Sequence, residues 1–273
     1  MLEYPEVIVF SSQLDKEIKG KRVAGVLPPN KEHKFCWFNG NPEGYESQIK
    51  GSSVESVKGF GIFIEICFDN GKRLCINDGV NVRLMQQSKI SKAYQLVINL
   101  DNDMSIVFTV AMYGGIYLHG GEYENEYYIK SAEALSPFDD SFKDYYYTVM
   151  SESRPGLSLK AFLAAEQRFP GIGNGVCQDI LFNAGLNPKS KLKTLSLTQQ
   201  ESLKDSIVSV LKEMTESGGR DTEKDIYGKN GGYKTRMSKN GIHMGCPVCG
   251  GPITKESYLG GSVYYCPVCQ PID

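Results

Sequence analysis

Alternation of apolar and polar positions is the main pattern from residue 22 to about residue 118. Short runs rich in β-branched and aromatic residues are separated by turn-forming residues, and Asp69-Asn70-Gly71 and Asp101-Asn102-Asp103 fit hairpin turns. The pattern predicts an N-terminal antiparallel β-sandwich, preceded by a flanking helix from Pro5 to about Lys19. The expected strands are 22–27, 57–68, 72–77, 94–100, 104–110 and 115–118.

Beyond Ser151 the apolar positions recur at helical spacing. Ser158 fits the cap of a helix that ends before Pro170, and the turn 170–174 leads into a second helix. Thr198 and Glu201 fit the capping box of a third helix. The chain is therefore predicted to be an α+β multidomain protein with a β-rich first part and a helical second part.

The segment 216–245 is rich in Gly, Asn and basic residues, and it is expected to be a long loop. Charge is divided unevenly along the chain. Residues 1–150 carry 15 Lys and Arg against 20 Asp and Glu, a net of −5, which leaves 15 against 12, or +3, for the rest. A basic C-terminal half fits a phosphate-binding face, and a solvated surface explains the same imbalance.

Four of the eight cysteines form two CxxC pairs, which are separated by a segment that can fold as a hairpin. The chain shows no apolar run of the roughly 18 residues that a membrane span requires, and no export signal at its N-terminus. We therefore expect a soluble cytoplasmic protein whose paired cysteines bind metal rather than form disulfides. Four thiolates satisfy a structural Zn²⁺, and these are Cys246, Cys249, Cys266 and Cys269.

Two further features allow both a structural and a functional interpretation. In the turn 170–174, Gly171 and Gly173 permit close backbone approach, so the following helix N-terminus can hold a phosphate or simply pack tightly. Asn174 can cap that helix or reach a phosphate. Glu3 and Glu6 lie one helical turn apart, as expected for an acid/base pair or for first-turn carboxylates that the helix dipole favours.

Together, the motifs at 1–7, 171–174, 226–228 and 246–270 resemble the formamidopyrimidine-DNA glycosylase/endonuclease VIII family in order and spacing. The resemblance implies a β-sandwich and a helix–two-turns–helix domain with a zinc β-hairpin, on either side of a DNA-binding cleft. The domains are then expected at 1–135, 136–240 and 241–273.

The resemblance also implies chemistry. Family enzymes flip a damaged base into a pocket, excise it, and cut the strand through a Schiff base at an N-terminal proline amine. Leu2 occupies that position here. A bulky second residue is expected to preserve Met1, which would place the free amine one residue away from the family's nucleophile.

Other family positions are altered as well. The zinc-hairpin arginine corresponds to Gly261, and the lysine of the early hairpin falls near Phe60, with Lys58 close by. The segment that fills the gap left by a flipped base corresponds to 110–115, and the family's His-Leu-Gly-Met motif corresponds to 76–79. Nucleophile, phosphate clamps and wedge all differ from the family pattern.

Three interpretations follow. The chain is a DNA glycosylase that uses water activated by Glu3 without a lyase step, a binding protein for abnormal DNA or structured RNA, or a conventional glycosylase with AP lyase activity. We favour a monomeric DNA-binding protein of this base-excision-repair family, acting on damaged or abasic duplexes. The candidate catalytic residues are Glu3 and Glu6, and the candidate DNA-binding residues are Lys58, Gly171, Gly173, Asn174, Lys234 and Arg236.

Overall fold

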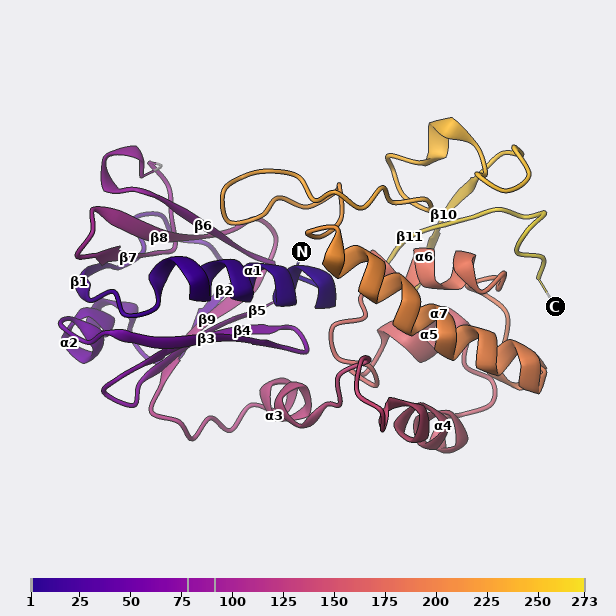
Figure 1. Cartoon of the computed structure of the whole chain (residues 1–273), viewed down its shortest axis with the longest axis horizontal. Coiled ribbons are helices and arrows are strands. Elements are labelled where there is room, and N and C mark those ends of the chain that lie inside the picture. The colour runs from indigo at the N-terminus through magenta and orange to yellow at the C-terminus, as the bar shows by residue number, and fades with distance from the viewer. Residues whose placement is uncertain (1, 78, 91, 273) are drawn as a thin grey trace.

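The computed structural model describes residues 2–77, 79–90 and 92–272. Two positions used in the family comparison, Met1 and Asp78, lie outside the described residues. Figure 1 shows a β-rich half and a helical half, with the first helix, α1 (Tyr4–Ile18), lying across the β-rich half. The N-terminal end of α1 points toward the helical half, so residues 2–6 lie where the two halves meet.

The β-rich half consists of two sheets. The first has the strand order β1-β7-β8-β6 and the second has the order β2-β9-β5-β4-β3. The strands are β1 (Val23–Leu27), β2 (Cys36–Phe38), β3 (Val54–Phe60), β4 (Phe63–Phe68), β5 (Arg73–Asn77), β6 (Val80–Gln86), β7 (Leu96–Leu100), β8 (Met104–Val110) and β9 (Gly114–His119).

One hydrophobic core joins the two sheets and α1. It contains buried aliphatic side chains from strands of both sheets, together with Val7, Phe10 and Leu14 of α1. Leu2 also belongs to this core and is only 3% exposed. The residue that precedes Glu3 is therefore anchored by apolar packing.

The sequence predicted most of the strands in this half, with three errors. The run 57–68 is two strands, because the chain turns at Gly61 and Ile62, and Phe60 pairs with Phe63 across that turn. Strands β2 and β6 were missed. The prediction of an entirely antiparallel arrangement is also wrong, since β2 pairs with β9 in parallel.

The helical half has its own hydrophobic core. It is built around Phe162, Ile180 and Ile207, and Tyr4 of α1 extends into it. Ser158 caps α5 as predicted, by accepting a hydrogen bond from the amide of Ala161. The helices after α1 are α2 (Tyr45–Ile49), α3 (Glu126–Glu133), α4 (Phe142–Glu152), α5 (Leu159–Ala164), α6 (Val176–Asn183) and α7 (Leu197–Glu216).

The capping box of α7 differs from the predicted one. Ser196 and Gln199 exchange the two capping hydrogen bonds, two residues before the predicted Thr198 and Glu201. Both pairs match the capping pattern, and the helix uses the earlier one. The remaining short helical turns are η1 (Pro42–Gly44), η2 (Gln87–Lys89), η3 (Leu192–Thr194) and η4 (Ile242–Met244).

After α7 the chain forms the predicted long loop, which returns to the β-rich half before reaching the C-terminal hairpin (Figure 1). Ile226 is fully buried in the core between the sheets, and its carbonyl accepts a hydrogen bond from Leu84 of β6. The hairpin consists of β10 (Thr254–Tyr258) and β11 (Gly261–Tyr265). Its turn is Leu259-Gly260, both at positive φ.

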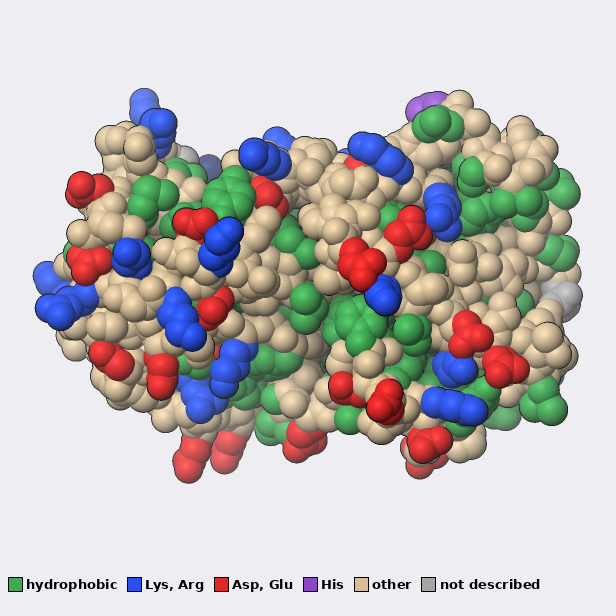
Figure 2. Space-filling view, in the orientation of Figure 1, with side chains coloured by type: hydrophobic (Ala, Val, Ile, Leu, Met, Phe, Trp, Pro, Cys, Tyr) green, Lys and Arg blue, Asp and Glu red, His purple; other side chains and the backbone are tan. Residues whose placement is uncertain are grey.

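Among the described residues, no helix combines the length and the apolar character needed to cross a membrane. Figure 2 shows basic and acidic side chains interspersed over the face in view, with apolar side chains between them. A net charge of −2 fits this mixture. On this face, binding to a polyanion would therefore depend on individual hydrogen-bond donors and basic side chains more than on a uniformly positive surface.

Candidate functional site

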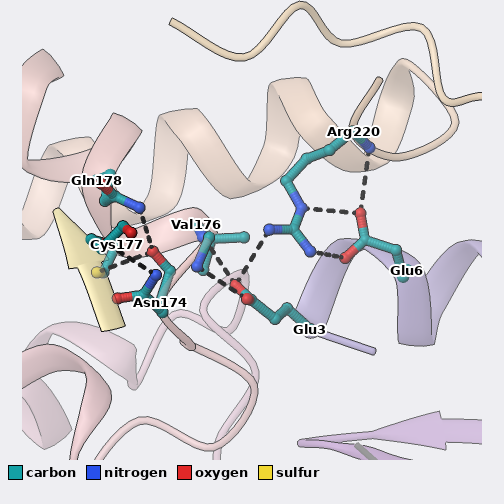
Figure 3. A network of polar contacts seen from close by, with 9 residues as sticks. Glu3, Glu6, Asn174, Val176, Cys177, Gln178 and Arg220 are labelled. Carbon is teal, nitrogen blue, oxygen red and sulfur yellow. Dashed lines mark hydrogen bonds and ion pairs between the residues drawn. The ribbon is translucent and has the colours of Figure 1, made fainter. Parts of the chain in front are cut away.

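Glu3 is bound to the N-terminus of α6. Its Oε1 accepts a hydrogen bond from the amide of Gly175 at 2.9 Å, and its Oε2 accepts one from the amide of Val176 at 2.7 Å (Figure 3). Free amides at the start of a helix and the positive end of its dipole both favour a carboxylate there. The side chain, whose residue is 3% exposed, is therefore held in one orientation.

Arg220 links the two candidate carboxylates. Its Nη1 lies 3.4 Å from Oε2 of Glu3, while Nε and Nη2 donate to the two oxygens of Glu6 at 3.0 and 2.6 Å (Figure 3). Burial disfavours the charge of Arg220, but Glu3 and Glu6 outweigh burial and raise its pKa above the ordinary value. Glu6 is fully buried and holds the guanidinium in place.

The glycines of the turn 170–174 are required by close packing. Gly171 has φ of +92°, and a Cβ there would lie 2.6 Å from the carbonyl oxygen of Gly61. A Cβ on Gly173 would lie 2.7 Å from the carboxyl carbon of Glu3. The amides of Gly175 and Val176, which the sequence suggested as phosphate donors, are occupied by Glu3. The steric interpretation of this turn therefore explains its glycines.

Asn174 joins the turn to the C-terminal hairpin. Its Nδ2 donates to the carbonyl of Ser262 at 3.1 Å, and its own carbonyl accepts a bond from Gln178 at 2.7 Å. A Cβ on Gly261 would lie 3.1 Å from Oδ1 of Asn174. Asn174 and Gly261, far apart in sequence, are thus neighbours in the structure.

A polar cavity of about 320 Å³ opens beside Glu3. It lies between the start of α6, the long loop after α7 and the hairpin, and residues from all three line it. Arg220 and Lys239 were not among the predicted site residues. Arg220 is separated from Glu6 by 214 positions, and nothing local marks it as the partner of that carboxylate. The principal lining residues are Glu3, Asn174, Arg220, Thr222, Lys239 and Ser262.

The predicted basic residues occupy two separate places. Lys58 is exposed on β3, opposite Glu65 of β4. Lys234 and Arg236 line another cavity, of about 430 Å³, which Pro247 of the first CxxC pair also lines. Arg236 is partly engaged, because its guanidinium lies 3.4 Å from Glu213. The structure therefore brings Lys234 and Arg236 together but not with Lys58.

Asp179 anchors the segment that carries these basic residues. Its buried carboxylate accepts the amides of Arg236 and Met237 at 2.9 and 2.7 Å. Burial raises the pKa of Asp179, and these two hydrogen bonds oppose the rise. The position of the long loop relative to α6 is thus fixed by a buried acceptor.

The four C-terminal cysteines form a group that could bind a metal. All four sulfurs lie within 4.8 Å of one another, and the pairs Cys246–Cys269 and Cys249–Cys266 are 3.7 and 3.5 Å apart. Zinc lies about 2.3 Å from each sulfur in such sites, which gives sulfur–sulfur distances of about 3.8 Å. The amide of Cys269 also donates to the sulfur of Cys266. The donor set and its spacing therefore fit zinc.

A second group of metal-ligand types lies in the five-stranded sheet, where Glu65, Cys75 and His119 are buried. The amide of Gly121 donates to Nδ1 of His119, so the proton of the neutral ring is on Nε2, 3.2 Å from the Cys75 sulfur. Cys75 and Tyr128 then donate to Glu65. This network is complete without a metal, and a metal on Nε2 would require the opposite tautomer.

Comparisons with known proteins agree with this architecture. No family model matches the chain. A formamidopyrimidine-DNA glycosylase from Wolbachia sp. subsp. Brugia malayi is 25% identical over 280 residues, which cover 99% of this chain and 100% of that protein. One from Legionella pneumophila is 24% identical over 279 residues, covering 100% of this chain and 99% of that protein. Over its full length the chain is thus similar to formamidopyrimidine-DNA glycosylases.

Solved structures of this family share the fold. The Lactococcus lactis Fpg in complex with DNA that contains an abasic site matches with a TM-score of 0.83 and 19% identity, over 98% of this chain and 99% of that one. The MutM (Fpg) protein from Thermus thermophilus matches with a TM-score of 0.81 and 20% identity, over 99% of both chains. The mixed α+β architecture is therefore that of formamidopyrimidine-DNA glycosylases.

Proposed function

We propose that this chain binds damaged or abasic duplex DNA and removes a damaged base with water activated by Glu3, without a Schiff-base step. One observation carries the proposal. Glu3 is held by two helix amides and faces Arg220 at the edge of a polar cavity. Relatives over the full length of the chain carry the name of DNA glycosylases, which agrees with base excision as the reaction.

The hydrogen bonds of Glu3 leave it able to accept a proton. A carboxylate has about four lone-pair sites. Gly175 uses one site on Oε1, while Val176 and Arg220 both face Oε2. Oε1 can therefore still accept a hydrogen bond from a water molecule, and the fixed carboxylate orients that water.

The reaction is a hydrolysis at the sugar. The water oxygen forms a bond to C1′ as the bond between C1′ and the base nitrogen breaks, and the electron pair of that bond leaves with the base. Glu3 takes the proton from the water and passes it on to the departing base. The positive charge of Arg220, 3.4 Å from Oε2 of Glu3, balances the carboxylate before the first of these steps and after the second.

Leu2 supports the absence of a covalent step. The family's nucleophile position is occupied here by a side chain that is buried in the core between the sheets. The neighbouring residues are fixed as well, because Glu3 binds α6 and the amide of Tyr4 donates to Gly171 at 2.8 Å. Presenting an amine at this position would require breaking these contacts.

The replacement of the family's nucleophile by Leu2 also favours a second candidate, a nucleic-acid-binding protein without catalysis. Such a protein would use the same surfaces for abnormal DNA or structured RNA. Competition between duplex DNA and folded RNA for one labelled duplex distinguishes the two ligands, and DNA is expected to compete at least tenfold better.

We further propose the finer family architecture. The two sheets form a β-sandwich domain over 1–135, α5 and α6 with their intervening turn form a helix–two-turns–helix domain over 136–240, and the four cysteines hold zinc in 241–273. Separate hydrophobic cores for the sheets, the helices and the hairpin support this division. We expect a monomer.

Phosphate contacts are proposed for Lys58, Lys234 and Arg236, with Gly171 and Gly173 shaping the turn and Asn174 positioning the hairpin. The affinity of a protein that neutralises phosphates falls as salt rises, with a slope of about −0.9 per phosphate contact. Affinity measured by fluorescence anisotropy across a salt series tests these contacts. An affinity independent of salt would contradict the model.

The decisive test is release of a free base from duplexes that carry different lesions. Glu3→Gln is expected to lower the rate by at least a hundredfold while retaining DNA binding, and Glu55→Gln, at an exposed position, serves as the matched control. Circular dichroism verifies that Glu3→Gln remains folded. Binding without base release by the wild type would favour the second candidate, and base release unaffected by Glu3→Gln would refute the role of Glu3.

A further inference from the structure

A cavity lined by aromatic side chains lies at the end of the five-stranded sheet, apart from the cavity beside Glu3. Its volume is about 440 Å³. Six separate parts of the chain contribute to it, namely β2, the β3–β4 turn, β5, the β8–β9 loop with β9, the start of α3 and the turn after α5. The lining residues used below are Trp37, Asn77, Tyr113, Tyr127 and Gln167.

Three rings of this cavity remain partly open to solvent. Trp37 is 49% exposed, Tyr113 is 37% exposed and Tyr127 is 54% exposed. Aromatic side chains normally bury most of their surface, so three open rings around one cavity indicate a binding site. None of the described residues that line the cavity is charged. The ligand is therefore expected to be flat and neutral.

The cavity also contains an unused polar atom. Oε1 of Gln167 is buried and has no hydrogen-bond partner among the described residues. Gln167 and the preceding Glu166 both have positive φ, +51° and +60°, which is uncommon for residues with side chains. Two such residues in succession hold Gln167 at the cavity wall, and strained backbone of this kind occurs often at binding sites.

Other contacts fix the walls. The side-chain oxygen of Asn77 accepts the amide of Gly115 at 2.9 Å. A Cβ on Gly115 would lie 2.0 Å from the ring of Tyr117, so the glycine allows that ring to lie against the backbone. The cavity is thus built from positions that are already constrained before any ligand arrives.

The position of the cavity relates it to the proposed active site. Ile62 also lines the cavity and follows Gly61 in the chain. The carbonyl of Gly61 packs against Gly171, whose own carbonyl accepts a hydrogen bond from the amide of Tyr4. Gln167 precedes that same turn. The aromatic cavity and Glu3 are therefore connected through a single rigid turn.

We infer that this cavity binds an unpaired nucleobase of a DNA duplex by stacking it on Trp37, Tyr113 or Tyr127. Nucleobases are flat and neutral, and they carry N–H groups that can donate a hydrogen bond to Oε1 of Gln167. The phosphates remain outside, where Lys34 lies 5.5 Å from the exposed ring of Phe35. The inference rests on the proposed function, since it assumes that the protein binds DNA.

Trp37 is the only tryptophan in the chain, so its fluorescence reports on this cavity alone. Three duplexes are compared at saturation: fully paired, with an abasic analogue opposite a normal base, and with abasic analogues in both strands. We expect quenching with the second duplex, and much less with the first and third. The abasic strand has no base at that position, so quenching with the second duplex assigns the bound base to the opposite strand.

Variants test the stacking directly. Tyr127→Ala is expected to weaken binding of the duplex with an unpaired base about tenfold, equivalent to about 1.4 kcal/mol, without affecting the fully paired duplex. Ile129→Ala, on the same helix and 43% exposed, serves as the control, since Ile129 does not line the cavity.

Anisotropy measured on the same samples separates the two hypotheses. Equal Trp37 emission with all three duplexes, while anisotropy shows that they are bound, would overturn the inference and leave the proposed function intact. Failure to bind any duplex would contradict the proposed function. The cavity would then be tested with a nucleoside monophosphate. This ligand must quench the fluorescence of Trp37 in the wild type and not in Tyr113→Ala.

Discussion

Glu3 and Glu6 lie one helical turn apart, yet their surroundings differ. Glu6 is fully buried and binds Arg220 through both oxygens, whereas Glu3 binds two amides at the edge of a cavity. We therefore propose that Glu3 has the chemical role and that Glu6 is a positioning residue. Sequence spacing could not distinguish these roles, because the difference arises from residues 170 to 220 positions away.

The ion pair between Glu6 and Arg220 should be important for stability. Glu6→Gln removes one partner of a buried pair and is expected to lower the free energy of unfolding by about 3–5 kcal/mol. Glu213→Gln breaks a partly exposed pair with Arg236 and should cost at most about 1 kcal/mol. Urea denaturation measures both, and similar losses for the two variants would contradict this account.

His119 should make stability depend on pH. Burial lowers its pKa below the ordinary value of 6.5, although Glu65 opposes the shift and Arg73 and Lys72 add to it. As pH falls through 6.5, the unfolded chain takes up a proton at this residue before the folded chain does. The stability that the neutral ring contributes is therefore present above this pH and lost below it.

The pH effect is measured as the free energy of unfolding between about pH 7 and pH 5. His119→Gln is expected to reduce the loss of stability over this interval, and His243→Gln, at an exposed position, to leave it unchanged. If His119→Gln lost as much stability between pH 7 and pH 5 as the wild type, other groups would be the cause of that loss.

At the scale of elements, the C-terminal hairpin depends on the four cysteines. Its two strands have few apolar neighbours of their own, with a small core around Tyr264, Ile253 and Phe182. A hairpin of this size is not expected to hold its shape without the metal.

Removal of zinc by a chelator should therefore disorder residues 246–270 and abolish DNA binding, while the sheets remain folded. Metal analysis is expected to give one zinc per chain, and Cys249→Ala should reduce it to none. Two metals per chain would contradict the assignment of the Glu65, Cys75 and His119 group as a hydrogen-bond network.

Gly261 offers a second prediction for this hairpin. It lies in β11 with extended backbone and faces Asn174, so an arginine there is compatible with the main chain if Asn174 shifts slightly. Gly261→Arg should strengthen DNA binding and make the salt slope steeper by about 0.9, as expected for one added phosphate contact. Gly261→Gln is the uncharged control. An unchanged slope would show that position 261 does not face phosphate.

Local signals explain which elements the sequence predicted. The turns at 69–71 and 101–103 and the cap at Ser158 involve residues adjacent in the chain, and all three are confirmed. Strand β4 is buried on both faces, and its mostly apolar sequence continues that of β3, which concealed the turn at Gly61. Strand β2 has three residues and pairs in parallel with a distant strand, which no short pattern reveals.

At the scale of the whole molecule, the site depends on contacts between the two halves. Tyr4 of α1 packs in the helical core, and Ile226 of the long loop packs in the core between the sheets. These contacts between the two halves hold Glu3 against α6 and Arg220 against both carboxylates. The cysteine motif could be predicted from spacing alone, but the Glu3–Arg220–Glu6 arrangement could not.

The central claim is that base removal proceeds through Glu3 and water, with no covalent intermediate. The most direct test incubates the wild-type protein with a duplex that carries a damaged base, in the presence of borohydride, and follows both the free base and the DNA strand. We expect free base, an intact abasic strand and no protein–DNA adduct. A borohydride-trapped adduct would contradict it.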